Sequence, residues 1–258
     1  MKKLLKKNNL LLKKKLDLLF KNLNIKKRDN LIVHSNIAGL LQFNGKINDD
    51  TLCFFLKYLI LKLGKESTLI IPVYNYDFTK IKKFDLEKAD SHLGIFGNYA
   101  LKHYRSNRTP NPIFSHLIFG KLKKKFFNTD HNSAFGKGTV FDLMHEYNFK
   151  ILNFCCSPDT ITFIHHIEQI LKVHYRFLKK FTGIIRYKKI EKKINYKYYV
   201  GKLNLNYRLK DNQILRLLNR KYFKQQKFGR FYCYISTAKY LMSSIKKNIT
   251  RDKNFLIN

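Results

Sequence analysis

A strand, helix and strand near the amino terminus constrain the fold more than any other feature of this chain. Residues 31–35 (LIVHS) form a short apolar run that ends on polar residues, which is typical of a buried strand. Residues 51–62 (TLCFFLKYLILK) predict a buried helix with Gly64 as its stop, and residues 67–78 (STLIIPVYNYDF) predict a second buried strand that Pro72 ends. Such a βαβ unit favours a parallel sheet with functional loops at the carboxyl ends of its strands.

The pattern recurs further along the chain. Residues 115–121 (SHLIFGK) and 149–156 (FKILNFCC) predict two more short strands, and the second of them ends in the loop SPDT. Residues 162–178 (TFIHHIEQILKVHYRFL) have apolar residues at helical spacing, preceded by three candidate caps: Asp159, Thr160 and Thr162. The predicted fold class is therefore α/β, with a central, largely parallel or mixed sheet flanked by helices.

The carboxyl-terminal part differs in composition. Residues 181–258 contain 20 Lys and Arg but three acidic residues, and alternating Tyr and Lys in residues 194–207 (INYKYYVGKLNLNY) predict an antiparallel excursion. We therefore expect a core over residues 1–183 and a smaller basic α+β lobe over residues 184–258 that completes the same domain.

The net charge is the most conspicuous bulk property. Lys and Arg number 52 against 17 Asp and Glu, a formal charge of +35, which in isolation favours nucleic acid or a membrane surface as partner. The excess is mostly lysine, with ten arginines, and the chain is rich in Asn, Ile, Phe and Tyr, as A/T-rich coding would produce. We therefore predict no specific nucleic-acid partner. A basic RNA-binding or anionic-membrane-binding protein without catalysis remains the alternative, and the amphipathic residues 10–23 leave peripheral membrane contact open.

Cysteine usage and hydropathy bear on the compartment. The four cysteines (Cys53, Cys155, Cys156 and Cys233) have no CxxC spacing, which favours reduced thiols in a cytoplasm. The basic amino terminus has no apolar core of the length a signal peptide needs, and no apolar stretch is long enough to span a bilayer. A cytoplasmic location is expected.

The segment FIHHIEQ (163–169) holds the main candidates for catalysis. His165 and Glu168 are three residues apart and share a helical face, whereas His166 points about 100° away. A carboxylate beside an imidazole orients the ring and raises its base strength, as a general base requires. A surface pair or a core histidine is the alternative interpretation. A metal site would need further ligands, and HExxH is absent, so we predict no metal.

Other polar residues follow the predicted strands where a parallel sheet would place a site. His34 and Ser35 end the first strand, and Asn75 and Asp77 follow the second. Asn111 and Ser115 flank the third. Each could be an ordinary loop residue, but together they would converge on one crevice.

Five segments together resemble a known family. LIVHSNI, TLIIPVYNYDF, RSNRTPNPIFSHLIFGK, FGKGTVFDL and TFIHHIE occur in the order and spacing of the aminoglycoside 3-N-acetyltransferases, also called antibiotic N-acetyltransferases, from about Leu10 to Leu171. NYDF and TFIHHIE look most like family members associated with amino sugars of surface polysaccharides. The phosphate-cradling motif of the GNAT acetyltransferases is absent.

The resemblance implies acetyl transfer from acetyl-CoA to a sugar amine. It implies that His165 is the general base and that Glu168 orients it. His34 and Ser35 match residues that line the thioester end of the cofactor in family members. Asp77 stands close to the sequence position where family members have an acidic residue that holds the substrate's ammonium, and Asn75 is predicted to bind substrate with it. The predicted cofactor-binding set is His34, Ser35, Asn36, Asn111, Ser115 and Thr139. Asn111-Pro112 stands where many relatives have His-Pro, so a histidine role at this loop does not carry over to Asn111.

The charge also bears on the acceptor. An aminoglycoside is a polycation, and a chain of charge +35 repels it at long range unless the pocket is locally acidic. We therefore favour a nucleotide-linked or lipid-linked amino sugar, which carries phosphate, over an aminoglycoside as the small-molecule partner, with the nucleotide-linked form preferred. The sequence does not predict an oligomeric state.

Overall fold

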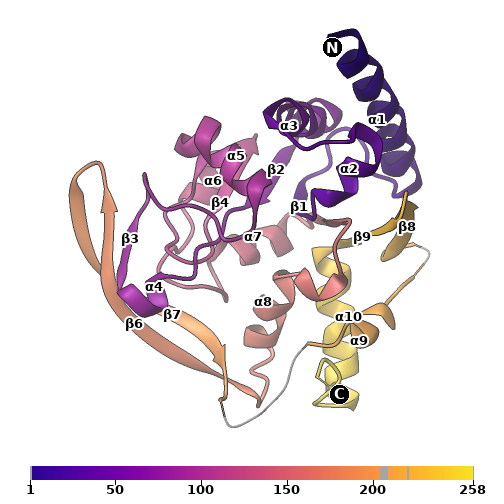
Figure 1. Cartoon of the computed structure of the whole chain (residues 1–258). Coiled ribbons are helices and arrows are strands. Elements are labelled where there is room, and N and C mark those ends of the chain that lie inside the picture. The colour runs from indigo at the N-terminus through magenta and orange to yellow at the C-terminus, as the bar shows by residue number, and fades with distance from the viewer. Residues whose placement is uncertain (1, 204–208, 220, 258) are drawn as a thin grey trace.

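The computed structural model describes residues 2–203, 209–219 and 221–257, which form two sheets with helices packed around the larger one (Figure 1). The larger sheet has six strands in the order β4-β2-β1-β5-β9-β8. Its strands are β1 (Leu31–Ser35), β2 (Thr68–Pro72), β4 (His116–Gly120), β5 (Lys150–Phe154), β8 (Lys224–Phe228) and β9 (Phe231–Thr237).

The centre of this sheet is parallel and its margins are antiparallel. β1 pairs in parallel with both β2 and β5, whereas β4 runs antiparallel to β2 and β9 runs antiparallel to β5. β8 then pairs antiparallel with β9. The sheet is therefore mixed, and the start of β4 lies at the same edge as the carboxyl ends of β1, β2 and β5.

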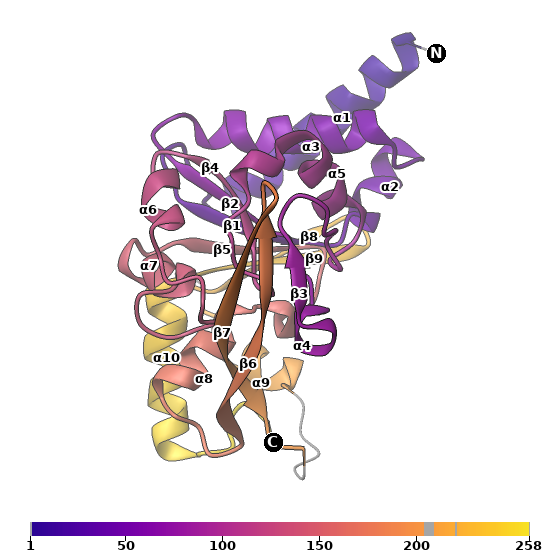
Figure 2. The ribbon, with the colours of Figure 1, turned by 90° about the vertical axis from the view of Figure 1, so that its left-hand side faces the viewer.

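Both faces of the central strands are buried, which explains why they are near-continuous apolar runs. Leu31 and Val33 of β1 face one hydrophobic cluster, and Ile32 faces the other. Helices α1, α3 and α5 cover the first face and α7, α8 and α10 the second, on opposite sides of the sheet in Figure 2. These helices are α1 (Lys2–Asn22), α3 (Asp49–Leu63), α5 (Ile95–Tyr104), α7 (Val140–Glu146), α8 (Phe163–Ile170) and α10 (Ala238–Arg251).

Short elements complete the connections. They are α2 (Ala38–Asn44), α4 (Phe78–Ile81), α6 (Lys123–Phe127), α9 (Asp211–Leu215) and two 3-10 turns, η1 (Arg105–Asn107) and η2 (Pro158–Thr160). None of the helices within the described residues combines the length and apolarity needed to cross a membrane.

The second sheet is a long two-stranded arm with one short partner. It consists of β3 (Lys83–Asp85), β6 (Arg176–Tyr187) and β7 (Ile190–Gly201) in the order β3-β6-β7. Lys188 and Lys189 both have positive φ at the turn, as a two-residue hairpin that matches the strand twist requires. The hairpin crosses in front of the larger sheet and faces the viewer in Figure 2.

The predicted fold class, α/β with a central mixed sheet flanked by helices, is confirmed. The smaller carboxyl-terminal lobe is not confirmed, because β8 and β9 extend the first sheet and α10 packs beneath it. The expected boundary at residue 183 falls inside β6. The antiparallel excursion is confirmed over β7, which pairs with β6, whereas residues 204–207 of that prediction lie outside the described residues.

The helix predicted over residues 162–178 is shorter than expected. α8 ends at Ile170, Lys172 adopts a left-handed φ of 50° that a helix cannot continue through, and residues 176–178 begin β6. Thr162 occupies the N-cap position without a side-chain cap bond. The N-cap position predicted for Thr162 is thus confirmed without its side-chain bond, whereas the Thr160 hydroxyl donates to the Ser157 carbonyl instead of capping the helix.

Candidate active site

A cavity of about 310 Å³ opens at the carboxyl edge of the parallel strands, where α/β folds place their sites. The loop between β5 and α8, the end of β1 and the segment after β2 form its walls, and the start of α5 closes it. Its lining residues are Val33, His34, Ser35, Ile71, Pro72, Tyr74, Tyr76, Leu93, Phe96, Gly97, Cys156, Asp159, Thr160, Thr162 and His165. Three predicted site residues, His34, Ser35 and His165, thus meet in one cavity.

His165 and Glu168 form the closest polar contact at this cavity. Helix α8 places both on one face, and His165 Nδ1 lies 2.6 Å from Glu168 Oε2. The imidazole is partly exposed in the cavity wall, whereas the Glu168 side chain is fully buried behind it. His166, which points away as expected, is buried and accepts a bond from the Gly136 N–H through Nδ1.

Glu168 is held ionised in a buried position. Burial alone opposes ionisation, but the hydrogen bond and positive charge of His165, together with the charge of Arg176 and a bond from Tyr175, lower the pKa of the carboxyl below its usual value. An ionised carboxylate only accepts hydrogen bonds, so the proton of the short contact belongs to His165 Nδ1. Nε2 is then the ring nitrogen left to accept a proton from a bound molecule.

His34 faces the same cavity as a neutral imidazole. Burial lowers its pKa to about 4, and its Nε2 has no hydrogen-bond partner within the described residues. Behind the cavity wall, His116 Nε2 lies 3.2 Å from the Tyr74 hydroxyl, and burial followed by the charge of His34 lowers the pKa of His116 to about 3. This wall therefore stays uncharged near neutral pH.

The other predicted cofactor-binding residues do not line the cavity. The Asn36 side chain accepts from the Ala38 N–H at 3.1 Å, and its own N–H donates to the Phe154 carbonyl. The remaining three are buried and bonded to backbone. The Asn111 side chain donates to the Ser133 carbonyl and accepts from the Ile113 N–H. The Ser115 hydroxyl donates to the Val73 carbonyl, and the Thr139 hydroxyl donates to the Gly136 carbonyl. In these positions they brace the loops around the site, and their part in cofactor binding stays a prediction.

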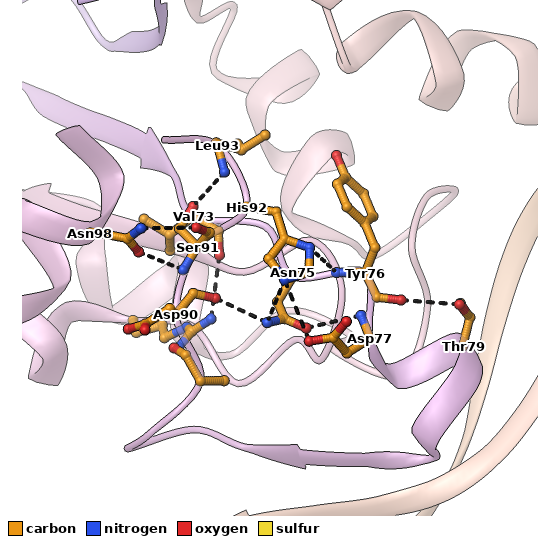
Figure 3. Close-up of polar contacts among 12 residues, drawn as sticks. Val73, Asn75, Tyr76, Asp77, Thr79, Asp90, Ser91, His92, Leu93 and Asn98 are labelled. Atoms are coloured by element: carbon orange, nitrogen blue, oxygen red, sulfur yellow. Dashed lines mark hydrogen bonds and ion pairs between the residues drawn. The ribbon is translucent and has the colours of Figure 1, made fainter. Parts of the chain in front are cut away.

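The predicted substrate residues lie beside the cavity in a second polar cluster (Figure 3). Asn75 is buried; its amide donates to the Asp90 carbonyl at 3.0 Å, and its Oδ1 accepts from the Asp77 N–H. Asp77 Oδ2 lies 3.4 Å from His92 Nε2, and both side chains are roughly half-exposed. Tyr76, between them, lines the cavity, so this cluster shapes the wall without entering it.

Two residues of the site were not among the sequence-based candidates. Arg176 contacts both His165 and Glu168, but it lay inside the predicted helix, where its position gave no reason to face them. Asp159 lines the cavity and had been interpreted as a helix cap. Burial and the neighbouring Asp211 carboxylate raise the pKa of Asp159. Asp211 belongs to α9, more than 50 residues away in sequence, so only the fold brings the two together.

Within the described part of the chain, no group of three or more His, Cys, Asp or Glu side chains is arranged to hold a metal ion. Cys155 and Cys233 lie with their sulfur atoms 3.7 Å apart as free thiols, and Cys156 lines the cavity. Burial raises the pKa of the Cys156 thiol to about 11, which disfavours a thiolate nucleophile near neutral pH.

Comparison with known proteins relates this architecture to acetyltransferases. A family model described as aminoglycoside 3-N-acetyltransferase matches residues 32–250. Sisomicin-bound AAC-VIa is 15% identical with a TM-score of 0.74, covering 93% of this chain and 98% of its own. AAC-IIIb in a binary complex with CoASH is 14% identical with a TM-score of 0.71, covering 89% and 94%.

A third similar structure, the YokD protein from Bacillus subtilis, is 16% identical with a TM-score of 0.73 and covers 94% of each chain. No match was found among curated protein sequences. At these identities the solved structures share the fold with this chain, and the family model carries the relationship in sequence.

Proposed function

The chain belongs to the aminoglycoside 3-N-acetyltransferase family, as its sequence motifs predict, and from this we propose that it transfers an acetyl group from acetyl-CoA to the amine of an aminoglycoside or amino sugar. The observation that carries the proposal is the 2.6 Å contact of His165 Nδ1 with Glu168 Oε2 in the wall of the cavity. A braced imidazole with one free nitrogen at a strand-end cavity supports general-base chemistry.

The reaction is a direct transfer in which His165 moves one proton. The neutral amine attacks the thioester carbonyl, forming a C–N bond while His165 Nε2 accepts a proton from the nitrogen. The C–S bond then breaks, and the coenzyme A sulfur leaves with the electron pair and takes up a proton. Glu168 remains ionised throughout and stabilises the imidazolium that forms. A direct route agrees with the raised pKa of Cys156, which makes an acyl-cysteine intermediate less favourable.

His34 and Ser35 are placed to receive the thioester end of acetyl-CoA. His34 stays neutral because burial lowers its pKa to about 4, so a ring N–H on the cavity side can donate to the thioester oxygen as negative charge develops there. Asn36 offers less than the sequence suggested, since its N–H already bonds to the Phe154 carbonyl. The oxyanion therefore depends on His34 and Ser35.

The charge of the cavity supports an amine-bearing acceptor. No lysine or arginine lines the cavity among the described residues, although the chain carries 52 of them, and Asp159 is its one acidic side chain. An ammonium group can pair with Asp159, while the positive charge elsewhere favours an acceptor that also carries phosphate. We therefore favour a nucleotide-linked amino sugar as substrate, with aminoglycosides as the alternative.

Release of free coenzyme A thiol across amino sugars, nucleotide-linked amino sugars and aminoglycosides tests both levels of the proposal. His165→Ala should lower kcat by about a thousandfold with the fold intact, since general-base catalysis contributes roughly 10²–10⁴-fold. His92→Ala is the matched control and should retain activity. Unchanged turnover in His165→Ala would exclude His165 as the base. Efficient acetylation of gentamicin with no turnover of nucleotide-linked sugars would overturn the substrate preference alone.

Contact with a membrane surface stays a separate prediction. Leu10, Leu11 and Leu18 are exposed on α1 among lysines, a pattern that suits an anionic lipid surface. Co-sedimentation with anionic and neutral vesicles at low and high salt tests it, with binding to anionic vesicles expected to weaken as salt rises.

A further inference from the structure

Arg176 makes three polar contacts at the back of the catalytic pair. It is the first residue of β6, and its side chain is about one-tenth exposed. Nε lies 2.8 Å from Glu168 Oε2, Nη2 lies 3.1 Å from His165 Nδ1, and Nη1 donates to the Tyr199 carbonyl at 3.3 Å. The long hairpin is thereby tied to helix α8 at the site.

The guanidinium changes what the carboxylate can do for the imidazole. Glu168 Oε2 accepts a hydrogen bond from His165 and forms an ion pair with Arg176, so its negative charge is shared between a neutral donor and a permanent cation. Arg176 Nη2 lies 3.1 Å from His165 Nδ1, and both atoms carry protons when Nδ1 donates to Glu168, so the two side chains are held together through Glu168 Oε2. A second proton on the ring would place two positive charges side by side, which disfavours the imidazolium relative to a simple histidine–glutamate pair.

We propose that Arg176 is a positioning residue that holds Glu168 on His165 Nδ1 and keeps His165 Nε2 free to accept a proton at lower pH than Glu168 alone would permit. This inference rests on the proposed function, since it concerns the same base. In an isolated pair, the buried carboxylate would stabilise the protonated ring and render the base inactive at mildly acidic pH. The arginine offsets that stabilisation while keeping the ring's orientation.

The other groups around His165 do not replace this role. On α8 itself the facing charged group is Glu168, to which Tyr175 also bonds. Across the cavity stand Asp159 from the loop before α8, His34 from β1, and the Cys156 thiol. On the remaining side the Phe135 ring packs 5.7 Å from the imidazole, measured between ring centroids. Among these described neighbours, Arg176 is the permanent cation at the ring.

Arginine is also distinguished by its geometry. Its planar fork reaches Glu168, His165 and the Tyr199 carbonyl at once, whereas a lysine ammonium is a single point at the end of a flexible stem. Arg176→Lys keeps the charge and loses the fork, and Arg176→Gln loses both. Arg186→Gln is the matched control, because Arg186 lies on the same strand, is half-exposed and pairs with Glu191 at 3.8 Å.

The test is the pH dependence of kcat/KM together with the titration of the His165 imidazole followed by NMR. In Arg176→Gln, the acid limb of the rate profile and the imidazole titration should both move up by about one pH unit, the size expected for removing a neighbouring charge. Activity should then be roughly tenfold below wild type on the acid limb and approach it at alkaline pH. Arg176→Lys should move the acid limb and the imidazole titration by less than Arg176→Gln does. Arg186→Gln should move neither.

A uniform loss of activity with an unmoved acid limb and an unmoved imidazole titration would overturn the proposal and assign Arg176 to structure alone. The NMR titration requires no substrate. If wild type acetylates no amine, the proposed function fails while the effect of Arg176 on the ring is still measured. If Arg176→Gln does not fold, Arg176→Lys decides by the same titration, and an unchanged imidazole would count against the proposal.

Discussion

The chain contains two histidine–carboxylate pairs close to the same cavity, and they differ in almost every physical respect. His165 and Glu168 lie 2.6 Å apart with the carboxylate fully buried, whereas His92 and Asp77 lie 3.4 Å apart with both side chains roughly half-exposed. A helical turn sets the first pair, and two loops bring the second together (Figure 3). The imidazole of the first pair lines the cavity, and neither member of the second does.

The difference shows that proximity alone does not make a catalytic pair. Water screens an exposed ion pair and leaves each side chain free to rotate, so its net effect on either partner is small. A buried carboxylate has no such freedom, because ionisation without partners would be strongly unfavourable. Glu168 therefore depends on His165 and Arg176, and the imidazole is held in one orientation as a result.

The largest contrast is expected in stability. Glu168→Gln leaves Arg176 buried without its carboxylate and should lower the free energy of unfolding at pH 7 by about 3 kcal/mol, the range for breaking one side of a buried pair. Asp77→Asn should lower it by less than about 0.5 kcal/mol. Urea denaturation of both variants beside wild type measures this. Equal losses would show that burial does not distinguish the two pairs.

The stability difference for Glu168 should itself depend on pH. Its folded-state pKa is lowered, so ionised Glu168 stabilises the fold above the unfolded value of 4.5, and this contribution is lost as pH falls through the folded value. The gap between wild type and Glu168→Gln should therefore narrow in acid. A gap that stays constant down to the acid limit of folding would contradict a charge-based origin.

Buried histidines without a carboxylate should also lose stability in acid, because burial opposes their protonation in the folded chain. Burial lowers the pKa of His166 to about 4, so below pH 6.5 the unfolded chain binds a proton that the folded chain refuses, and stability falls as pH drops toward 4. Between pH 7 and 5 this amounts to about 2 kcal/mol for one histidine. His166→Gln should remove that share of the dependence of stability on pH.

Asp159 and Asp77 should also differ in their effect on substrate binding. Asp159 lines the cavity, so Asp159→Asn should raise the KM for the amine acceptor by about tenfold while leaving the KM for acetyl-CoA unchanged, as expected for loss of one charged contact. Asp77→Asn should raise it less, because Asp77 is half-exposed beside His92. A larger effect at Asp77 would identify it as the residue that holds the ammonium, as the family resemblance suggested.

Much of the fold followed from local sequence patterns, and the parts that did not have physical reasons. β1, β2 and β5 are buried on both faces, so each is a continuous apolar run that the sequence displays. β8, with its alternating exposed residues KQQKF, lies at the sheet edge and carries no such signal. Residues 176–178 fit a helix by periodicity. However, the left-handed φ of Lys172 prevents α8 from continuing beyond Ile170, and residues 176–178 pair with β7 as the start of β6.

The same division applies to the site. The His165–Glu168 pair was predictable because both residues belong to one helical turn, and His34 and Ser35 because strand ends converge. Arg176 and the Asp159–Asp211 contact depend on tertiary pairing between segments whose spacing has no local period. The sequence places Asn111 and Ser115 beside the cavity. Neither lines it, because both side chains are buried and bonded to the backbone of the loops that support it.

The smallest effect is expected at His92. Its Nδ1 lies 3.4 Å from the Tyr76 N–H and its Nε2 faces Asp77 at the same distance, so both contacts are long and partly solvated. His92→Gln keeps a polar side chain there and should change kcat/KM by less than about twofold and stability by a few tenths of a kcal/mol. Steady-state kinetics at pH 6 and pH 8 measures it. If His92→Gln instead lost activity selectively at pH 6, the exposed pair would be taking part in proton transfer, and the distinction between the two pairs would have to be drawn from something other than burial.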